Sequence, residues 1–270
     1  MDPQLLDQVL GLPGVELQSI TDILLIYIVL ALRLGGFFLA APFFGAQSVP
    51  VQVRIIATMS VALFLFGRVP VPDLTVLSTA AQIVLAFREL FIGLSAGLIL
   101  SILFAVASLA GEKIATSSGL SFAMQIDPNA GGQTPVVSQI LSLFLLAIFL
   151  SLDGHLAILS IMIASYEVLP IGGDQPLDPF VSAGLEAGGS LFTLASVIMM
   201  PLVATLLLAN ILVGVVTRSA PQLNLFAFGF PLTMLTAFVG LYLSVIPLAH
   251  AFSDLVDFMI DVLRKLLGAG

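Results

Sequence analysis

The chain has 270 residues, of which 59% are hydrophobic and 9% are charged, with a mean hydropathy of +1.18 and a net charge of −8. Soluble domains carry about 25% charged residues, so this composition excludes an ordinary soluble protein and predicts a chain that lies in a bilayer or a large assembly. The negative charge argues against nucleic acid as a partner, and the absence of cysteine excludes disulfides, thiolate metal sites and cysteine nucleophiles.

The first two apolar runs differ in length. Residues 23–46, interrupted by Arg33, are long enough to cross a hydrocarbon core about 30 Å thick. Residues 55–67 are short for a span, so they predict a half or re-entrant helix. Two prolines within residues 68–73 then predict a clear break.

The third run, residues 74–110, exceeds one span and contains the adjacent pair Arg88 and Glu89. Small residues follow the pair at three- and four-residue spacing, and they predict one helix face that allows close packing against another helix. These residues are Gly93, Gly97, Ser101, Ala105 and Ser108.

The fourth run, residues 136–166, predicts either a hairpin of two short helices or one long helix bent at Gly154. Residues 167–189 are polar and contain acids but no basic residue, so we interpret them as a loop, with or without one short helix.

The chain ends with two more apolar runs and a tail. Residues 191–216 and 230–252 predict long helices joined by a polar turn at 217–229. Residues 253–267 predict an amphipathic helix, because charged residues share one stripe and apolar residues oppose them. The charged stripe is Asp254, Asp257, Asp261, Arg264 and Lys265, and the apolar one is Leu255, Phe258, Met259, Val262 and Leu266.

The segment of residues 119–135 is the most informative feature. It is rich in glycine and proline, and it separates two long apolar runs. Irregular backbone at membrane depth must find its hydrogen bonds in protein or water, so such a loop is expected to line a cavity or close a pore. Phe122 predicts either an apolar plug, since hydrophobic constrictions close pores, or an anchor of the loop into its own core. Asp127 and Pro128 are typical of a helix or turn start.

Charged residues within the apolar runs are expensive and are usually paired or face water. Arg33 predicts either a contact in a pore or subunit interface, or a structural role, as an ion pair that packs helices together or a side chain that reaches toward an interface. We favour the interface or packing interpretation. Arg88 and Glu89 point about 100° apart on a helix, so each requires a partner elsewhere, in this chain or another.

Enzymatic and metal chemistry have no support in the sequence. We find no nucleophile with a base, no phosphate loop and no paired carboxylates, and the two histidines, His155 and His250, lie far apart. We therefore expect no enzyme, no metal and no cofactor. Arg218, near the end of an apolar run, suits a helix C-terminus, where the helix dipole favours a cation.

Three ordered segments of the chain form a recognisable set. They begin at Gly119, at Gly154-His155-Leu156 and at Asn210, and the last continues through Gly214, Arg218, Pro221, Gln222, Phe226, Gly229, Phe230 and Pro231. Together they resemble the FliR family of flagellar export-gate proteins and, more distantly, the matching subunit of virulence type III secretion systems. The match covers nearly the whole chain in order, and Arg33, Pro42, Pro50 and Arg54 resemble the family's opening pattern.

The resemblance implies an all-α fold of hydrophobic helical hairpins that form part of a helical, cone-like export-gate assembly. Residues 1–187 would be a FliP-like part with a plug loop at 111–135. Residues 188–270 would be a FliQ-like hairpin with the amphipathic tail. Bent hairpins would also explain the unusual run lengths, including the third run of 74–110.

Site residues follow from the same resemblance. The glycine-rich loop matches the family's plug, with Phe122 as its blocking side chain, and the turn near Arg218 matches a loop at the cytoplasmic entrance. The gate or plug residues are Gly119, Phe122, Met124, Asp127, Pro128, Gly131 and Gly132. The interface or packing residues are Arg33, Arg54, Arg88, Glu89, Arg218, Pro221 and Gln222.

The predicted function is that of a core subunit of the flagellar type III export gate, which lines and gates the channel for unfolded flagellar substrates. The implied partners are FliP-type and FliQ-type subunits, an FlhB-type switch protein and, transiently, the exported proteins. The implied location is the bacterial inner membrane, as a multi-pass protein within the flagellar basal body. The alternative is a self-contained secondary transporter of a small solute, which needs an internal repeat and several midplane polar residues.

Overall fold

The computed structural model describes residues 17–43, 49–74, 76–119, 135–220 and 228–268, and all regular elements in these ranges are helices. This confirms the predicted all-α fold. Three helices are long and apolar enough to cross a membrane, or up to five if each of two bent pairs is one span. The described residues form two compact units, one from the described parts of 1–98, 159–182 and 263–270, the other from those of 99–158 and 183–262.

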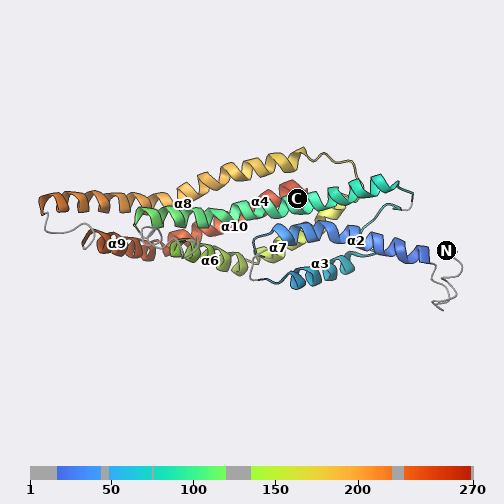
Figure 1. Cartoon of the computed structure of the whole chain (residues 1–270), viewed down its shortest axis with the longest axis horizontal. Helices are drawn as coiled ribbons and strands as arrows, with labels where there is room; N and C mark the ends of the chain where they lie inside the picture. Colours follow the sequence, from blue (N-terminus) through green and yellow to red (C-terminus); the bar gives the residue numbers. More distant parts are fainter. Residues whose placement is uncertain (1–16, 44–48, 75, 120–134, 221–227, 269–270) are drawn as a thin grey trace, which may run out of the picture. The chain divides into compact units, whose positions relative to one another are not determined.

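The first unit contains α2 (Leu17–Ala40) and α3 (Val51–Leu65), which lie side by side (Figure 1). The α3 helix begins directly after Pro50 and is short, as predicted. The hydroxyl of Tyr27 on α2 donates to the carbonyl of Met59 on α3 at 2.7 Å. The core of this unit includes Leu30, Leu34 and Phe37, all fully buried.

The third apolar run forms one continuous helix, α4 (Thr79–Ser117), so the expectation that this run is a bent hairpin is wrong. The helix contains no proline, and Gly93 and Gly97 lie within it, where the lack of a Cβ atom allows the backbone of α2 to approach closely. The helix begins after Ser78, whose hydroxyl accepts a hydrogen bond from the backbone N–H of Ala81, a typical N-cap contact. Because α4 ends at Ser117, residues 111–117 of the predicted plug loop are helical.

The fourth run forms two helices, α6 (Val136–Ser151) and α7 (Gly154–Val168), with a bend of 66° between them. The break lies at Asp153, which has a left-handed φ of 54°. A Cβ atom on Gly154 would lie 2.6 Å from the ring of Phe149, so close packing requires glycine there. The run therefore forms two short helices with a bend directly before Gly154, where the sequence predicted it.

The α8 helix (Asp178–Ser219) is longer than predicted, because residues 178–189 form its first turns instead of a loop. Asp178 and Pro179 are a typical helix start, and Gly184, Gly188 and Gly189 do not end the helix. The predicted division of the chain at residue 187 falls inside this helix and stays a prediction.

The last apolar run is divided into α9 (Phe230–Leu243) and α10 (Val245–Leu267), with a bend of 62°. Pro247 explains the break inside the predicted run 230–252, because a proline ring clashes with the carbonyl four residues earlier, here that of Leu243. The α10 helix is amphipathic as predicted: Leu255 and Met259 are buried, and its five charged residues from Asp254 to Lys265 are exposed.

The second unit has an aromatic core. Phe149 of α6 meets Phe104 of α4 edge to face at 5.1 Å, and Phe144 of α6 meets Phe252 of α10 at 5.7 Å. Large apolar side chains on α8 remain exposed in the isolated chain, and only 17% of its most apolar window is buried. Such a surface is typical of a membrane or assembly contact.

Candidate functional site

The described stem of the predicted plug loop is the end of α4 and the turn at Ser118 and Gly119. Ser118 is fully buried, and Gly119 has a φ of +80°, a conformation that favours glycine. A Cβ atom on Gly119 would lie 3.1 Å from the ring of Phe230, the first residue of α9. Both the backbone conformation and the neighbouring ring therefore require glycine at this position.

The C-terminal end of the loop, at Pro135, also lies where two helices pack closely. Pro135 precedes α6, and a Cβ atom on Gly111 of α4 would lie 2.5 Å from the Cα of Ser138 on α6. The two helices that flank residues 120–134 therefore approach each other at backbone distance. The other predicted gate residues lie outside the described residues: Phe122, Met124, Asp127, Pro128, Gly131 and Gly132.

Arg33 and Glu89 form a buried ion pair within the first unit. The Nε of Arg33 lies 2.7 Å from Oε2 of Glu89, and the two side chains are 0% and 1% exposed. The other guanidinium nitrogens donate to Oγ of Ser165 at 3.1 Å and to the carbonyl of Leu169 at 2.8 Å. The guanidinium of Arg33 also lies over the ring of Tyr166, 4.2 Å from its centroid.

Close packing of helices surrounds this pair. A Cβ atom on Gly93 would lie 1.8 Å from the carbonyl oxygen of Arg33, and one on Gly97 would lie 2.8 Å from that of Phe37. The predicted small face therefore brings α4 against α2 at these two positions. The hydroxyl of Tyr166 donates to the carbonyl of Leu30 at 2.8 Å and so joins α7 to α2.

Arg88, next to Glu89 in sequence, has different partners, as its direction on the helix requires. It donates to the backbone carbonyl of Gln175, and its Nη1 lies 3.8 Å from Oδ1 of the exposed Asp174. Arg54 in the first turn of α3 donates to the carbonyl of Val49 at 3.0 Å. Arg88 and Arg54 thus hold loop segments of the first unit.

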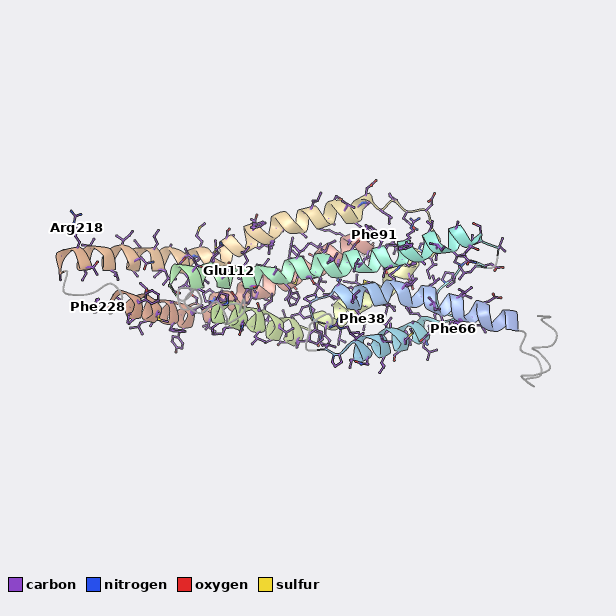
Figure 2. All side chains as sticks on the ribbon, in the orientation of Figure 1. Phe38, Phe66, Phe91, Glu112, Arg218 and Phe228 are labelled. Carbon is purple, nitrogen blue, oxygen red and sulfur yellow. The ribbon has the colours of Figure 1, made fainter. Side chains whose placement is uncertain are left out.

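Arg218 is exposed in the last turn of α8, where a cation suits the helix dipole. Figure 2 shows its side chain at the end of α8, pointing away from the neighbouring helices. Pro221 and Gln222 lie outside the described residues. The described chain resumes at Phe228, just before α9.

Sequence reasoning did not assign a structural role to four polar residues that the fold uses. Ser165 and Tyr166 complete the environment of Arg33, and Asn210 and Thr233 contact the end of α4. The sequence pattern that could have indicated them is the presence of single polar residues within apolar runs. Among the described residues, no group of three or more His, Asp or Glu side chains is placed to hold a metal ion.

Comparison with known proteins places these features in a family context. Residues 24–259 match the model of the family described as "Bacterial export proteins, family 1". The chain is 34% identical to the flagellar biosynthetic protein FliR of Escherichia coli (strain K12) over 87% of this chain and 91% of that protein. It is 28% identical to FliR of Bacillus subtilis (strain 168) over 93% and 98% of the two chains. It is 32% identical to FliR of Aquifex aeolicus (strain VF5) over 82% and 87%.

Proposed function

The chain belongs to the FliR family of bacterial export proteins, and on that basis we propose that it is a core subunit of the flagellar type III protein export gate. The observation that carries the proposal is the family match, which extends over residues 24–259 and includes all eight described helices in whole or in part. The work of such a subunit is to line and gate a channel for unfolded flagellar proteins, without catalysis.

The proposed partners are FliP-type and FliQ-type subunits in one helical, cone-like assembly, an FlhB-type switch protein and exported substrates in transit. The proposed location is the inner membrane, as a multi-pass protein within the flagellar basal body. The exposed apolar side chains of α8 and α9, such as Phe192, Leu208 and Phe238, support burial against lipid or other subunits. Residues 1–187 would be the FliP-like part and residues 188–270 the FliQ-like part.

Within this gate, residues 119–135 would act as the plug, with Phe122 as the blocking side chain. The fixed ends of the segment support this proposal, because Gly119 and the contact between Gly111 and Ser138 anchor it to packed helices. Glycines between the anchors would let the backbone rearrange on opening. The remaining plug residues would be Met124, Asp127, Pro128, Gly131 and Gly132.

The seven other candidate residues would serve packing or subunit interfaces. Arg33 and Glu89 suit packing, because their charged atoms contact groups of the same chain. Arg218 suits an interface, because it is exposed at a helix end. Arg54, Arg88, Pro221 and Gln222 complete the set.

The solute-transporter alternative is disfavoured by the same ion pair. A midplane binding site needs polar groups that face a solute path. Arg33 and Glu89, the strongest candidates for such groups, are sealed from solvent and bound to each other.

The experiment that tests the proposal is gentle extraction of the tagged chain, expressed with its genomic neighbours, followed by mass spectrometry of the intact particle. We expect a large complex that contains two other small hydrophobic proteins. A particle that contains only this chain, as monomer or dimer, would overturn the export-gate proposal.

The plug role has its own test. We expect Phe122→Ala to make resting cells leak ions or small solutes, because the apolar constriction would admit water. Permeability is measured with an ion-sensitive dye in cells that do not export. Phe228→Ala, a change of the same size at an exposed position before α9, is the matched control. Equal permeability of the two variants would remove Phe122 from the plug.

A further inference from the structure

The end of α4 is unusual in how its backbone carbonyls are satisfied. The last four carbonyls of a helix have no partner within the helix itself. Here the carbonyl of Ile114 accepts from the N–H of Ser118 at 3.0 Å, that of Thr116 from the N–H of Gly119 at 3.2 Å, and that of Ala115 from the Ser118 hydroxyl at 2.9 Å. The turn at Ser118 and Gly119 thus satisfies three of the four.

The next two carbonyls depend on distant parts of the chain. The carbonyl of Ser117 accepts from Nδ2 of Asn210 on α8 at 3.0 Å, across 93 positions of sequence. The carbonyl of Ser118 accepts from the hydroxyl of Thr233 on α9 at 3.1 Å, across 115 positions. The helix end that leads into residues 120–134 is therefore completed by α8 and α9.

These two bonds differ in how easily they break. Asn210 is exposed on a face of α8 that otherwise presents large apolar side chains such as Leu207 and Ile211, so its amide has few alternative partners if this face is covered by lipid or protein. The Thr233 hydroxyl lies 3.0 Å from the carbonyl of Phe230 on its own helix and 3.1 Å from that of Ser118. One hydroxyl proton serves both carbonyls, so it can turn from one to the other at small cost.

We propose that Asn210 and Thr233 are positioning residues of a latch that holds the end of α4, and with it the entry to the plug segment, to α8 and α9. The inference rests on the proposed gate function. Movement of α8 would open the bond from Asn210, and movement of α9 would open the bond from Thr233 and release Gly119 from the ring of Phe230. The latch would thus couple the C-terminal helices of the chain to its gate.

The test uses the complete export complex, in cells and after purification. Thr233→Val removes the hydroxyl but keeps the shape, and Asn210→Leu removes the amide at an exposed position. Thr236→Val is the matched control, because the Thr236 hydroxyl donates to the carbonyl of Leu232 within α9 at 2.8 Å and has no other partner among the described residues. Thr233→Ser is a second control, because it keeps the hydroxyl that Thr233→Val removes. Three properties are measured: recovery of the complex, amide hydrogen exchange at residues 114–119, and resting-cell permeability, with Phe122→Ala as the reference for an open gate.

We expect Asn210→Leu to speed amide exchange at residues 114–119 by about fivefold, the effect of losing one neutral hydrogen bond, and Thr233→Val to speed it by less, because its hydroxyl is shared. We also expect both to raise resting permeability while the complex is recovered in normal yield. Thr236→Val and Thr233→Ser are expected to match the unmodified protein in both measurements. If Thr233→Val prevents assembly, Asn210→Leu decides the outcome.

The latch is overturned if Thr233→Val and Asn210→Leu behave like Thr236→Val while Phe122→Ala leaks; the gate proposal then stands without a latch. If cells with Phe122→Ala also show unchanged permeability, both the gate role of residues 119–135 and the latch are contradicted. A leak from the latch variants without one from Phe122→Ala supports the latch and removes Phe122 as the blocking side chain.

Discussion

The α4 helix is held by two sets of contacts, one around Glu89 in the first unit and one at Ser117 and Ser118 in the second. Around Glu89 the contact is an ion pair with Arg33. The other guanidinium nitrogens of Arg33 donate to the hydroxyl of Ser165 and the carbonyl of Leu169. At the helix end both contacts are neutral hydrogen bonds to backbone carbonyls. One donor there is exposed, and the other has a second acceptor within its own helix.

The two sets of contacts differ in the free energy needed to break them. Removing one partner of a buried ion pair costs about 3 to 5 kcal/mol, because the other charge is left without compensation. A neutral hydrogen bond contributes about 1 kcal/mol net, and a shared one contributes less. The first unit therefore uses charge to fix its packing, whereas the second holds the end of α4 with neutral hydrogen bonds that a small movement can break.

The largest expected effect tests the ion pair. We expect Arg33→Ala to destabilise the chain by about 3 to 5 kcal/mol and to reduce recovery of the assembled complex more than it changes conduction. Recovery is measured by extraction and size separation, and conduction by resting permeability. The double variant Arg33→Ala with Glu89→Ala should lose less than the sum of the single variants, because no charge remains unpaired. A normally assembled complex with altered conductance would mean that Arg33 acts in the conduit.

A smaller effect is expected where α4 meets α2. Gly93→Ala places a methyl group 1.8 Å from a backbone oxygen of Arg33, and backbone cannot rotate aside. Overpacking of this kind costs about 1 to 3 kcal/mol. Gly188→Ala in α8 is the matched control, because no atom of the described residues lies within 4 Å of its added methyl group. Alanine also favours a helix over glycine by about 1 kcal/mol. Thermal midpoints of the purified complex should fall for the first variant and stay or rise for the second; equal midpoints would contradict the close approach.

The smallest effect concerns whether the latch acts as one unit. We expect the double variant Asn210→Leu with Thr233→Val to speed exchange at residues 114–119 by less than the product of the single effects, because losing either bond already loosens the same helix end. Exchange rates of the two single variants and the double variant are compared under identical conditions. Independent, multiplicative effects would show that α8 and α9 hold α4 separately.

Much of the fold could be predicted from residue patterns. Prolines predicted the break after α3, and small residues at Gly93 and Gly97 predicted a packing face. A stripe of charged residues at helical spacing predicted that α10 is amphipathic. The ends and breaks of helices were harder to predict, because hydropathy shows where a chain is apolar and not where its backbone hydrogen bonds stop following the helical pattern. Asp178 and Pro179 start α8 within a polar segment, and Pro247 divides an apolar run at Ser244.

The helical class, the apolar character, the family and the need of Arg33, Arg88 and Glu89 for partners can all be inferred from residue patterns, because periodicity and the cost of buried charge are local properties. The identity of those partners becomes visible only in the folded chain. Glu89 reaches Arg33 across 56 positions, and the end of α4 reaches Asn210 and Thr233 across 93 and 115. Contacts over such separations depend on how helices cross, which residue spacing along one helix does not specify.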